Sequence, residues 1–184
     1  MPEYIVNTCP GGAYFRLAAM PTPGATVLAL DPGLRLGWAA VDTRSKLLLA
    51  GGFIELDRTR LYASGYEAVD VMLKELCPVA VAFEEYFLMG GAHNKESVEV
   101  RGAMKAPAQK AGIPCGQLHP SKIRANLNLR GKVSDPQIRE SVASLFGIPT
   151  KYQPNPNKKT KLYFPADVFD AAAVAWSADS MEGL

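Results

Sequence analysis

The sequence predicts an α/β domain with a central, mixed, five-stranded sheet and helices on both of its faces. Three apolar runs rich in β-forming residues follow one another at hairpin distance, and after them strand-like runs alternate with segments of helical periodicity. Hairpins join antiparallel strands whereas crossover helices join parallel ones, so the sheet is expected to be mixed. With 184 residues, of which 48% are hydrophobic and 21% charged, the chain can bury the core of one such domain.

The three hairpin-linked strands are predicted between residues 26 and 56. The run "TVLALD" (26–31) is short and apolar and ends at the turn signal Pro32-Gly33, which is typical of a buried strand. The runs "LGWAAVD" and "KLLLAGGFIEL" follow it and complete the group. Two further buried strands are expected at 79–84 ("VAVAFE") and at 113–119 ("IPCGQLH").

Two helices are predicted around these later strands. Residues 60–76 carry apolar side chains at helical spacing, and the pattern stops before Cys77-Pro78. Residues 93–112 can form a second helix, which Pro107 would kink or divide because proline lacks the backbone N–H that a helix needs.

The C-terminal third of the chain is expected to contain two more helices separated by a loop. In "SDPQIRESVASLFG", Ser134 is a natural N-cap, Gln137 completes a capping box and Gly147 can end the helix. Residues 151–165 form a basic stretch rich in Pro and Asn, which is typical of a loop. The last helix is predicted from about 166 to about 178.

Residues 1–25 are expected to be a flexible N-terminal extension, because they are rich in Pro and Gly and weakly patterned, and residues 26–184 are expected to form the folded domain. No apolar run is long enough to span a bilayer, and the first residues lack the features of a signal peptide, so a cytoplasmic protein without membrane association is predicted. The three cysteines are scattered without CxxC spacing, which indicates buried, reduced thiols rather than disulfides or a zinc site.

Positive charge is concentrated in one part of the chain. Residues 122–161 contain nine Lys or Arg and two acids, a net charge of +7, and because the whole chain carries +2 the remainder carries −5. Such polarity favours a polyanionic partner on one face of the protein, with a solvated basic surface as the alternative.

Four carboxylates fall at the ends of predicted elements. Asp31 ends the first strand, Glu84 ends the fourth, and Asp167 and Asp170 lie three residues apart on one face of the last helix. Functional sites collect at the carboxyl ends of strands in open α/β sheets, so these acids can converge. Taken singly, Asp31 can be a turn residue and Asp167 a helix cap, but Asp170 lies among Ala, Val and Phe inside the helix.

Converging carboxylates repel one another unless a cation compensates their charge. Hard oxygen ligands with no His or Cys nearby favour Mg²⁺ or Mn²⁺ over Zn²⁺. Two such ions about 3.5–4 Å apart can activate a water and stabilise the leaving oxygen in phosphodiester hydrolysis. The four acids therefore predict a site for two Mg²⁺ ions, for which Mn²⁺ can substitute.

Three segments, "VLALDPGLRLGWA", "VAFEEYF" and "ADVFDAAAVA", resemble in order and approximate spacing the three acidic motifs of RuvC-type Holliday junction resolvases, which belong to the ribonuclease H-like superfamily. The resemblance covers roughly residues 26–178. It implies a ribonuclease H-like fold and a magnesium-dependent, homodimeric endonuclease that cuts four-way DNA junctions, with forks or flaps as further branched substrates. It also suggests a branch-migration motor as a partner in cellular relatives.

The resemblance implies roles for individual residues. The metal-binding acids of the family correspond to Asp31, Glu84, Asp167 and Asp170, of which Asp31 and Asp170 would hold or bridge the metals. Phe87 matches an aromatic side chain that family members stack on a base near the junction centre, and a core position is the alternative. Further DNA-binding candidates are Tyr86, Lys122, Arg124, Arg130, Lys132, Lys158 and Lys159.

The chain departs from the family pattern in three places. Lys122 follows the fifth strand as expected, but Asp135 stands where the family typically has another lysine, and Lys132 is the substitute we expect. The N-terminal extension is not part of the usual pattern. Loop 151–165 is longer than expected and lies just before the last acidic motif, which favours contact with DNA, with a solvated, partly disordered loop as the alternative.

Two other functions stay open at this point. YqgF-like RNA-processing nucleases of the same superfamily share the opening Asp-x-Gly turn, although the Asp-x-x-Asp-Ala motif fits resolvases better. A junction-binding module that has kept the fold and lost cleavage is the other alternative, because the lysine motif is displaced.

Overall fold

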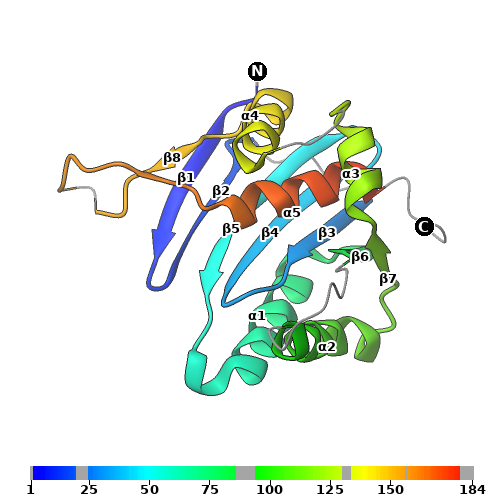
Figure 1. Ribbon diagram of the computed structural model, residues 1–184. Helices are drawn as coiled ribbons and strands as arrows, with labels where there is room; N and C mark the ends of the chain where they lie inside the picture. The colour runs from blue at the N-terminus through cyan, green and yellow to red at the C-terminus, as the bar shows by residue number, and fades with distance from the viewer. Residues whose placement is uncertain (1, 20–24, 86–93, 130–133, 156, 179–184) are drawn as a thin grey trace.

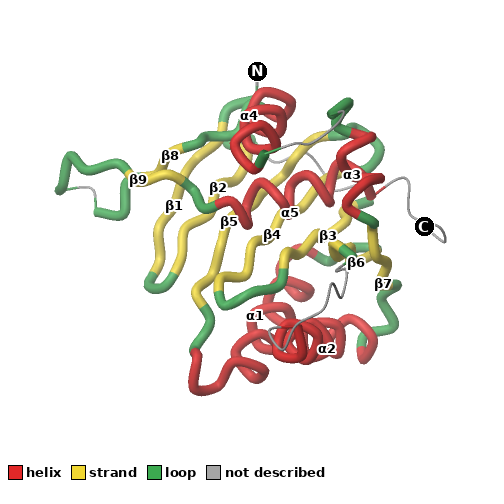
Figure 2. The backbone as a smooth tube through the Cα atoms, in the orientation of Figure 1, coloured by secondary structure: helices red, strands yellow, loops and turns green. Residues whose placement is uncertain are grey.

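The structure, a computed structural model, describes residues 2–19, 25–85, 94–129, 134–155 and 157–178. Its centre is a seven-stranded mixed sheet in the order β1-β2-β5-β4-β3-β6-β7. Helices cover both faces of this sheet (Figures 1 and 2). The predicted α/β architecture is confirmed, with two strands more than the five that the sequence predicted.

Neighbouring strands are antiparallel from β1 to β3 in this order, whereas β3-β6 and β6-β7 are parallel. The strands are β1 Tyr4–Cys9, β2 Gly12–Leu17, β3 Thr26–Asp31, β4 Arg35–Asp42, β5 Leu47–Glu55, β6 Ala80–Glu84 and β7 Cys115–Leu118. The helices are the 3₁₀ turn η1 Arg58–Arg60 and α1 Leu61–Leu76, α2 Asn94–Lys110, α3 Pro120–Asn126, α4 Asp135–Phe146 and α5 Ala166–Ser177. A separate small hairpin pairs β8 Lys151–Tyr152 with β9 Leu162–Tyr163.

Two apolar cores separate the sheet from its helices. On one face α5 crosses β3 and β4, and α3 and α4 pack against α5, with Phe146, Phe164 and Phe169 in the core between them. On the other face α1 and α2 pack together, and their core includes Phe83 and Met104. Figure 1 shows α5 on one side of the sheet and the α1–α2 pair on the other.

The first residues of the chain form part of the sheet, which corrects the prediction of a flexible extension. Strands β1 and β2 make a hairpin whose second strand pairs with β5. The reason is the alternation in β2, which buries Ala13, Phe15 and Leu17. Pro10 and Gly11, which are part of the Pro and Gly content that suggested an extension, form the turn between these strands, where Gly11 adopts φ 74°. Whether 26–184 is a domain by itself stays a prediction.

The local predictions agree with the structure in the rest of the chain. All five predicted strands and four predicted helices are present within a few residues, and the capping box of Ser134 and Gln137 forms. Helix α2 is not divided, because Pro107 lies in its last turn. Three features were missed: the 3₁₀ turn η1, the short helix α3, and the β8–β9 pairing within the predicted loop.

The cysteines differ from the prediction. All three are free, but Cys9 and Cys77 are exposed and Cys115 is partly buried. Cys9 ends an edge strand, and Cys77 occupies the left-handed position that ends α1, so neither faces a core. Across the described residues, no helix has the length and apolar character needed to cross a membrane.

Candidate active site

The ends of β3 and β6 place two carboxylates on the face of the sheet that α5 covers. Leu30 of β3 and Phe83 of β6 are partners in the parallel register, and both are buried on the α1–α2 side. Successive side chains of a strand point to opposite faces. Asp31 and Glu84, the next residue in each strand, therefore point toward α5 from adjacent strands.

Gly37 lets the first turn of α5 lie directly on the sheet beside Asp31. Gly37 of β4 is the cross-strand partner of Asp31 and thus points to the same face. A Cβ atom at Gly37 would overlap the carbonyl group of Asp167 and lie 2.9 Å from its Cβ. The space that a side chain would fill is occupied by the start of α5, which brings Asp167 next to Asp31.

The two aspartates of α5 are half-buried beside buried apolar neighbours. Val168, Phe169 and Ala171 are buried in the core, whereas Asp167 and Asp170 are only partly covered. Asp167 lies in the first turn, where the positive end of the helix dipole favours a negative charge. The helix therefore packs through its apolar positions and presents both carboxylates at one end.

The electrostatics of Asp31 show that the four acids are neighbours. Burial raises the pKa of Asp31 well above its ordinary value, and the charges of Asp170, Glu84 and Asp167 raise it further. Burial is also the main cause that raises the pKa of Glu84 and of Asp167. Each of these three groups is thus held where its ionised form is disfavoured, which is the situation that a bound cation relieves.

Three arginines reduce this excess of negative charge, and the sequence analysis singled out only one of them. Arg101 of α2, 8% exposed, lowers the pKa of both Asp31 and Glu84, and Arg124 of α3 lowers that of Glu84. Arg35 of β4 has its Nη1 atom 3.9 Å from Oδ2 of Asp167 and lowers the pKa of that group. Arg101 gave no sequence signal, because it belongs neither to an acidic motif nor to the basic segment, and Arg35 lies within the first acidic motif but was not singled out there.

The donor chemistry of the four acids fits a hard divalent cation, since all are carboxylates. Among the described residues, however, no group of three or more His, Cys, Asp or Glu side chains is arranged to hold a metal ion. The carboxylates are nevertheless close enough for the charges of Asp170, Glu84 and Asp167 to raise the pKa of Asp31.

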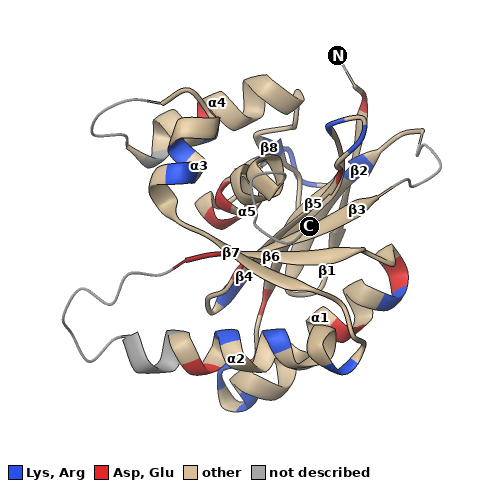
Figure 3. Cartoon of the chain, turned by 90° about the vertical axis from the view of Figure 1, so that its right-hand side faces the viewer, with Lys and Arg blue, Asp and Glu red and all other residues tan. Residues whose placement is uncertain are grey.

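The predicted DNA-binding residues are placed only in part. Lys122 and Arg124 are exposed on α3, which packs against α5 on the same side of the sheet as the acids (Figure 3). Lys158 and Lys159 are exposed in the segment between β8 and β9. The remaining candidates, Tyr86, Phe87, Arg130 and Lys132, lie outside the described residues.

Comparison with known proteins gives relatives of one kind. No family model matches the chain. A crossover junction endodeoxyribonuclease RuvC of Parafrankia sp. is 29% identical over 161 residues, which is 81% of this chain and 83% of the relative. The protein of the same description from Trichlorobacter lovleyi is 27% identical over 157 residues, covering 81% of this chain and 82% of the relative.

Solved structures show the same fold. The Thermus thermophilus RuvC structure in complex with a Holliday junction substrate superposes with a TM-score of 0.66 and 21% identity, covering 84% of this chain and 92% of that one. The yeast mitochondrial Holliday junction resolvase Ydc2 superposes with a TM-score of 0.54 and 14% identity, covering 88% and 82% of the two chains. The predicted resemblance to RuvC-type resolvases and the ribonuclease H-like fold are confirmed.

Proposed function

We propose that this protein is a metal-dependent, structure-selective endonuclease that cleaves phosphodiester bonds in branched DNA, as a Holliday junction resolvase does. The observation that carries the proposal is the meeting of four carboxylates from β3, β6 and the first two turns of α5 at one end of a ribonuclease H-like sheet. Four carboxylates would repel the phosphates of DNA unless bound cations compensate their charge. Cations held at such a place stabilise the negative charge that develops during phosphodiester cleavage.

Asp31, Glu84, Asp167 and Asp170 would hold two Mg²⁺ ions, with Mn²⁺ able to replace them. Raised pKa values and mutual repulsion support this assignment, because they show charge that the protein leaves largely uncompensated. When bound, the ions would supply Lewis-acid activation of the phosphodiester and neutralise its developing charge. The packing of α5 on Gly37 holds the two helix-borne acids against the strand-borne acids.

Lys122 and Arg124 would bind the phosphates of the strand to be cut. Both are exposed on α3, and Arg124 is close enough to Glu84 to lower its pKa, so a phosphate between α3 and the acids would meet a cation on one side. Phosphate contacts carry no sequence information, so a cleavage preference would come from base contacts or from distortion of the junction. Contacts by Tyr86, Phe87, Arg130 and Lys132 are included in the proposal from the sequence alone.

The proposal extends to assembly and location. A C2 homodimer would match the two-fold character of a four-way junction and allow paired cuts. A branch-migration motor as a partner, and action in the cytoplasm, follow from the same resemblance.

The test is cleavage of end-labelled four-way junction, fork, flap and linear duplex in Mg²⁺, in Mn²⁺ and in chelator. Paired nicks across the junction are expected from the parent protein and are expected to be lost in chelator and in Asp170→Asn. Glu75→Gln, an exposed carboxylate of α1, is the matched control and is expected to cleave normally.

The two alternative functions are outcomes of the same experiment. Junction binding without cuts in either metal would replace the endonuclease by a junction-binding module. Structured RNA added as a competing substrate, cut in preference to the junction, would replace it by an RNA-processing nuclease of the YqgF-like kind.

A further inference from the structure

A strongly basic hairpin leads directly into α5. This basic hairpin, residues 151–165, contains four lysines and no acid. Its two short strands pair Lys151 with Tyr163 and Tyr152 with Leu162, and the chain then continues to the first residue of α5. In Figure 1 the hairpin projects from the body of the protein next to the start of α5. Whatever it binds will lie close to the acids of that helix.

The basic hairpin is anchored to the core on its inner side. The Tyr152 ring lies 4.9 Å from that of Phe164 and 5.8 Å from that of Phe53, measured between centroids. Phe164 is 1% exposed and contacts Phe15 edge-on at 5.5 Å. The paired residues 151–152 and 162–163 therefore form a hairpin base that is anchored to the core.

Hydrogen bonds also order the segment beyond the paired residues. The Gln153 side-chain nitrogen donates to the carbonyl oxygen of Lys158 at 2.6 Å and to that of Asn155 at 3.2 Å. The backbone N–H of Lys158 donates to the carbonyl oxygen of Asn155 at 3.0 Å. A segment ordered before binding loses less conformational entropy when a ligand binds.

The outer side of the basic hairpin combines cations with an exposed aromatic ring. Tyr163 is 59% exposed, and Nζ of Lys151 lies 4.7 Å from its ring centroid. Lys158, Lys159 and Lys161 are exposed, and no carboxylate of the described part of the chain forms an ion pair with them. Unpaired lysines beside an aromatic ring are the surface that nucleic-acid backbones and bases recognise.

A groove with two arginines joins the basic hairpin to the candidate active site. This arginine groove, of about 340 Å³, is lined by two cations, Arg35 and Arg139, one carboxylate, Glu55, and apolar or aromatic residues that include Tyr163 and Phe164. The guanidinium of Arg35 lies 3.5 Å from the carboxylate of Glu55 and 3.9 Å from that of Asp167. Arg35 thus links the groove to a carboxylate of the acidic cluster.

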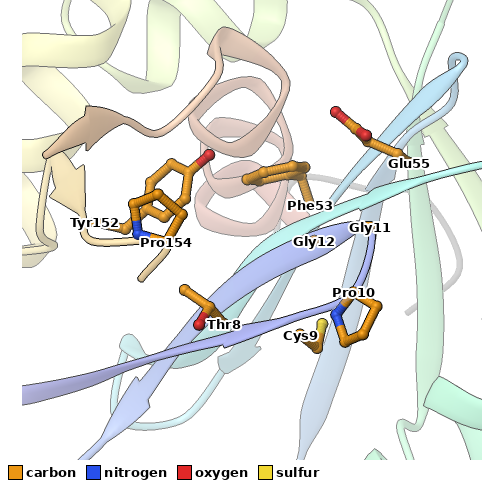
Figure 4. A pocket seen from close by; sticks show the side chains of 9 residues that line it. All are labelled: Thr8, Cys9, Pro10, Gly11, Gly12, Phe53, Glu55, Tyr152 and Pro154. Carbon is orange, nitrogen blue, oxygen red and sulfur yellow. The ribbon is translucent and has the colours of Figure 1, made fainter. Parts of the chain in front are cut away.

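Arg139 is the second cation of this groove. Its guanidinium lies over the ring of Phe169, with the carbon Cζ 5.4 Å from the ring centroid. A guanidinium on the wall of a groove can donate charge-assisted hydrogen bonds to an anionic ligand. The larger neighbouring cavity, about 440 Å³ and lined by Thr8, Glu55, Tyr152 and other residues shown in Figure 4, has no cation among its lining residues, so it does not offer an anion the same site.

We propose that the basic hairpin and the arginine groove bind the phosphate backbone of the DNA arm that leads into the acidic cluster. The proposal rests on the proposed function for the identity of the DNA, and it names a second contact surface, separate from the one that Lys122 and Arg124 form on α3. Because the hairpin would hold DNA in the ground state and in the transition state alike, it raises affinity without contributing to the chemical step.

The test compares two triple variants that remove the same charge. Lys158→Ala/Lys159→Ala/Lys161→Ala changes the basic hairpin, and the matched control Arg44→Ala/Arg58→Ala/Lys110→Ala removes three exposed cations from other elements. Binding of a labelled four-way junction is measured by fluorescence anisotropy in chelator from low to moderate salt. The same proteins are then assayed for junction cleavage in Mg²⁺, and circular dichroism checks their folding.

In the hairpin variant, the slope of log affinity against log salt is expected to be smaller in magnitude by about 2.7, which is roughly 0.9 for each of the three phosphates that the missing lysines no longer neutralise. In the control variant, the slope is expected to stay nearly unchanged. KM for the junction should rise in the hairpin variant with kcat within about two-fold of the parent. Arg139→Gln should reduce the slope by about 0.9. An unchanged slope in the hairpin variant or in Arg139→Gln, or an equal reduction in the control, would overturn the proposal.

Failure of the proposed function gives a different pattern. Absence of junction cleavage by the parent protein contradicts the nuclease and leaves the binding comparison intact. Normal cleavage by the parent together with equal behaviour of the two triple variants contradicts the role of the basic hairpin alone.

Discussion

Replacing Gly37 by alanine tests the packing that brings the acidic cluster together. The new methyl carbon would overlap the Asp167 carbonyl group and lie 2.9 Å from Asp167 Cβ, whereas real Cβ atoms essentially never approach other atoms within 3.0 Å. Backbone cannot rotate away as a flexible side chain can, so the start of α5 must move by about 1 Å. Overpacking of this kind costs about 1–3 kcal/mol of the free energy of unfolding.

The displacement matters more for activity than for stability. Asp167 and Asp170 move with α5 while Asp31 stays on the sheet, so the distances between the carboxylates change by the same amount. A misplacement of about 1 Å in a catalytic constellation lowers the rate by about 100-fold. We expect Gly37→Ala to show this loss in single-turnover junction cleavage at saturating protein and Mg²⁺.

Gly52→Ala separates the two effects. A methyl carbon at Gly52 would lie 2.6 Å from the Cα of Tyr14, a comparable backbone overlap between β5 and β2, away from the acids. It should lower the thermal midpoint by a similar amount and keep cleavage within about three-fold of the parent at temperatures where both are folded. Gly37→Ala cleaving as well as Gly52→Ala would refute the packing argument.

Three further predictions follow from the structure. Because the pKa of Asp31 is raised in the folded protein, the stability that this group contributes is complete below its ordinary pKa and is lost as pH rises through the raised value, so Asp31→Asn should raise the thermal midpoint in chelator near neutral pH. The same substitution should abolish stabilisation by Mg²⁺, which in the parent should reach about 2.7 kcal/mol at 100 times Kd. Scanning calorimetry with and without chelator checks both results, and a Mg²⁺ shift that survives the substitution would contradict the site. Because the N-terminal hairpin belongs to the sheet, Phe15→Ala should lower the free energy of unfolding, measured by urea denaturation, by about 3–5 kcal/mol. Ile5, which is 42% exposed, provides the control, and Ile5→Ala should lower that free energy little. Gln137→Ala removes one half of a capping box and should cost about 1 kcal/mol in the same assay, with a change below about 0.3 kcal/mol counting against the cap.

Local patterns alone determined much of this protein. The strand 26–31, the capping box at Ser134 and the helix end at Gly147 were all predictable, because each depends on residues within a few positions of one another. The spacing of Asp167 and Asp170 fixed their common helix face for the same reason. The acidic motifs in their order were enough to identify the resemblance to resolvases.

Tertiary structure decided what depends on residues distant in the chain. The N-terminal hairpin was taken for an extension because its stability comes from Phe15 meeting Phe164, a contact between the two ends of the sequence. The influence of Arg101 on Asp31 arises because α2 packs with α1 over one face of the sheet, a placement that no local pattern encodes. In the sequence, Gly37 looks like an ordinary strand residue. Only the close approach of α5 shows that a side chain at this position would displace Asp167 and Asp170, two of the four carboxylates.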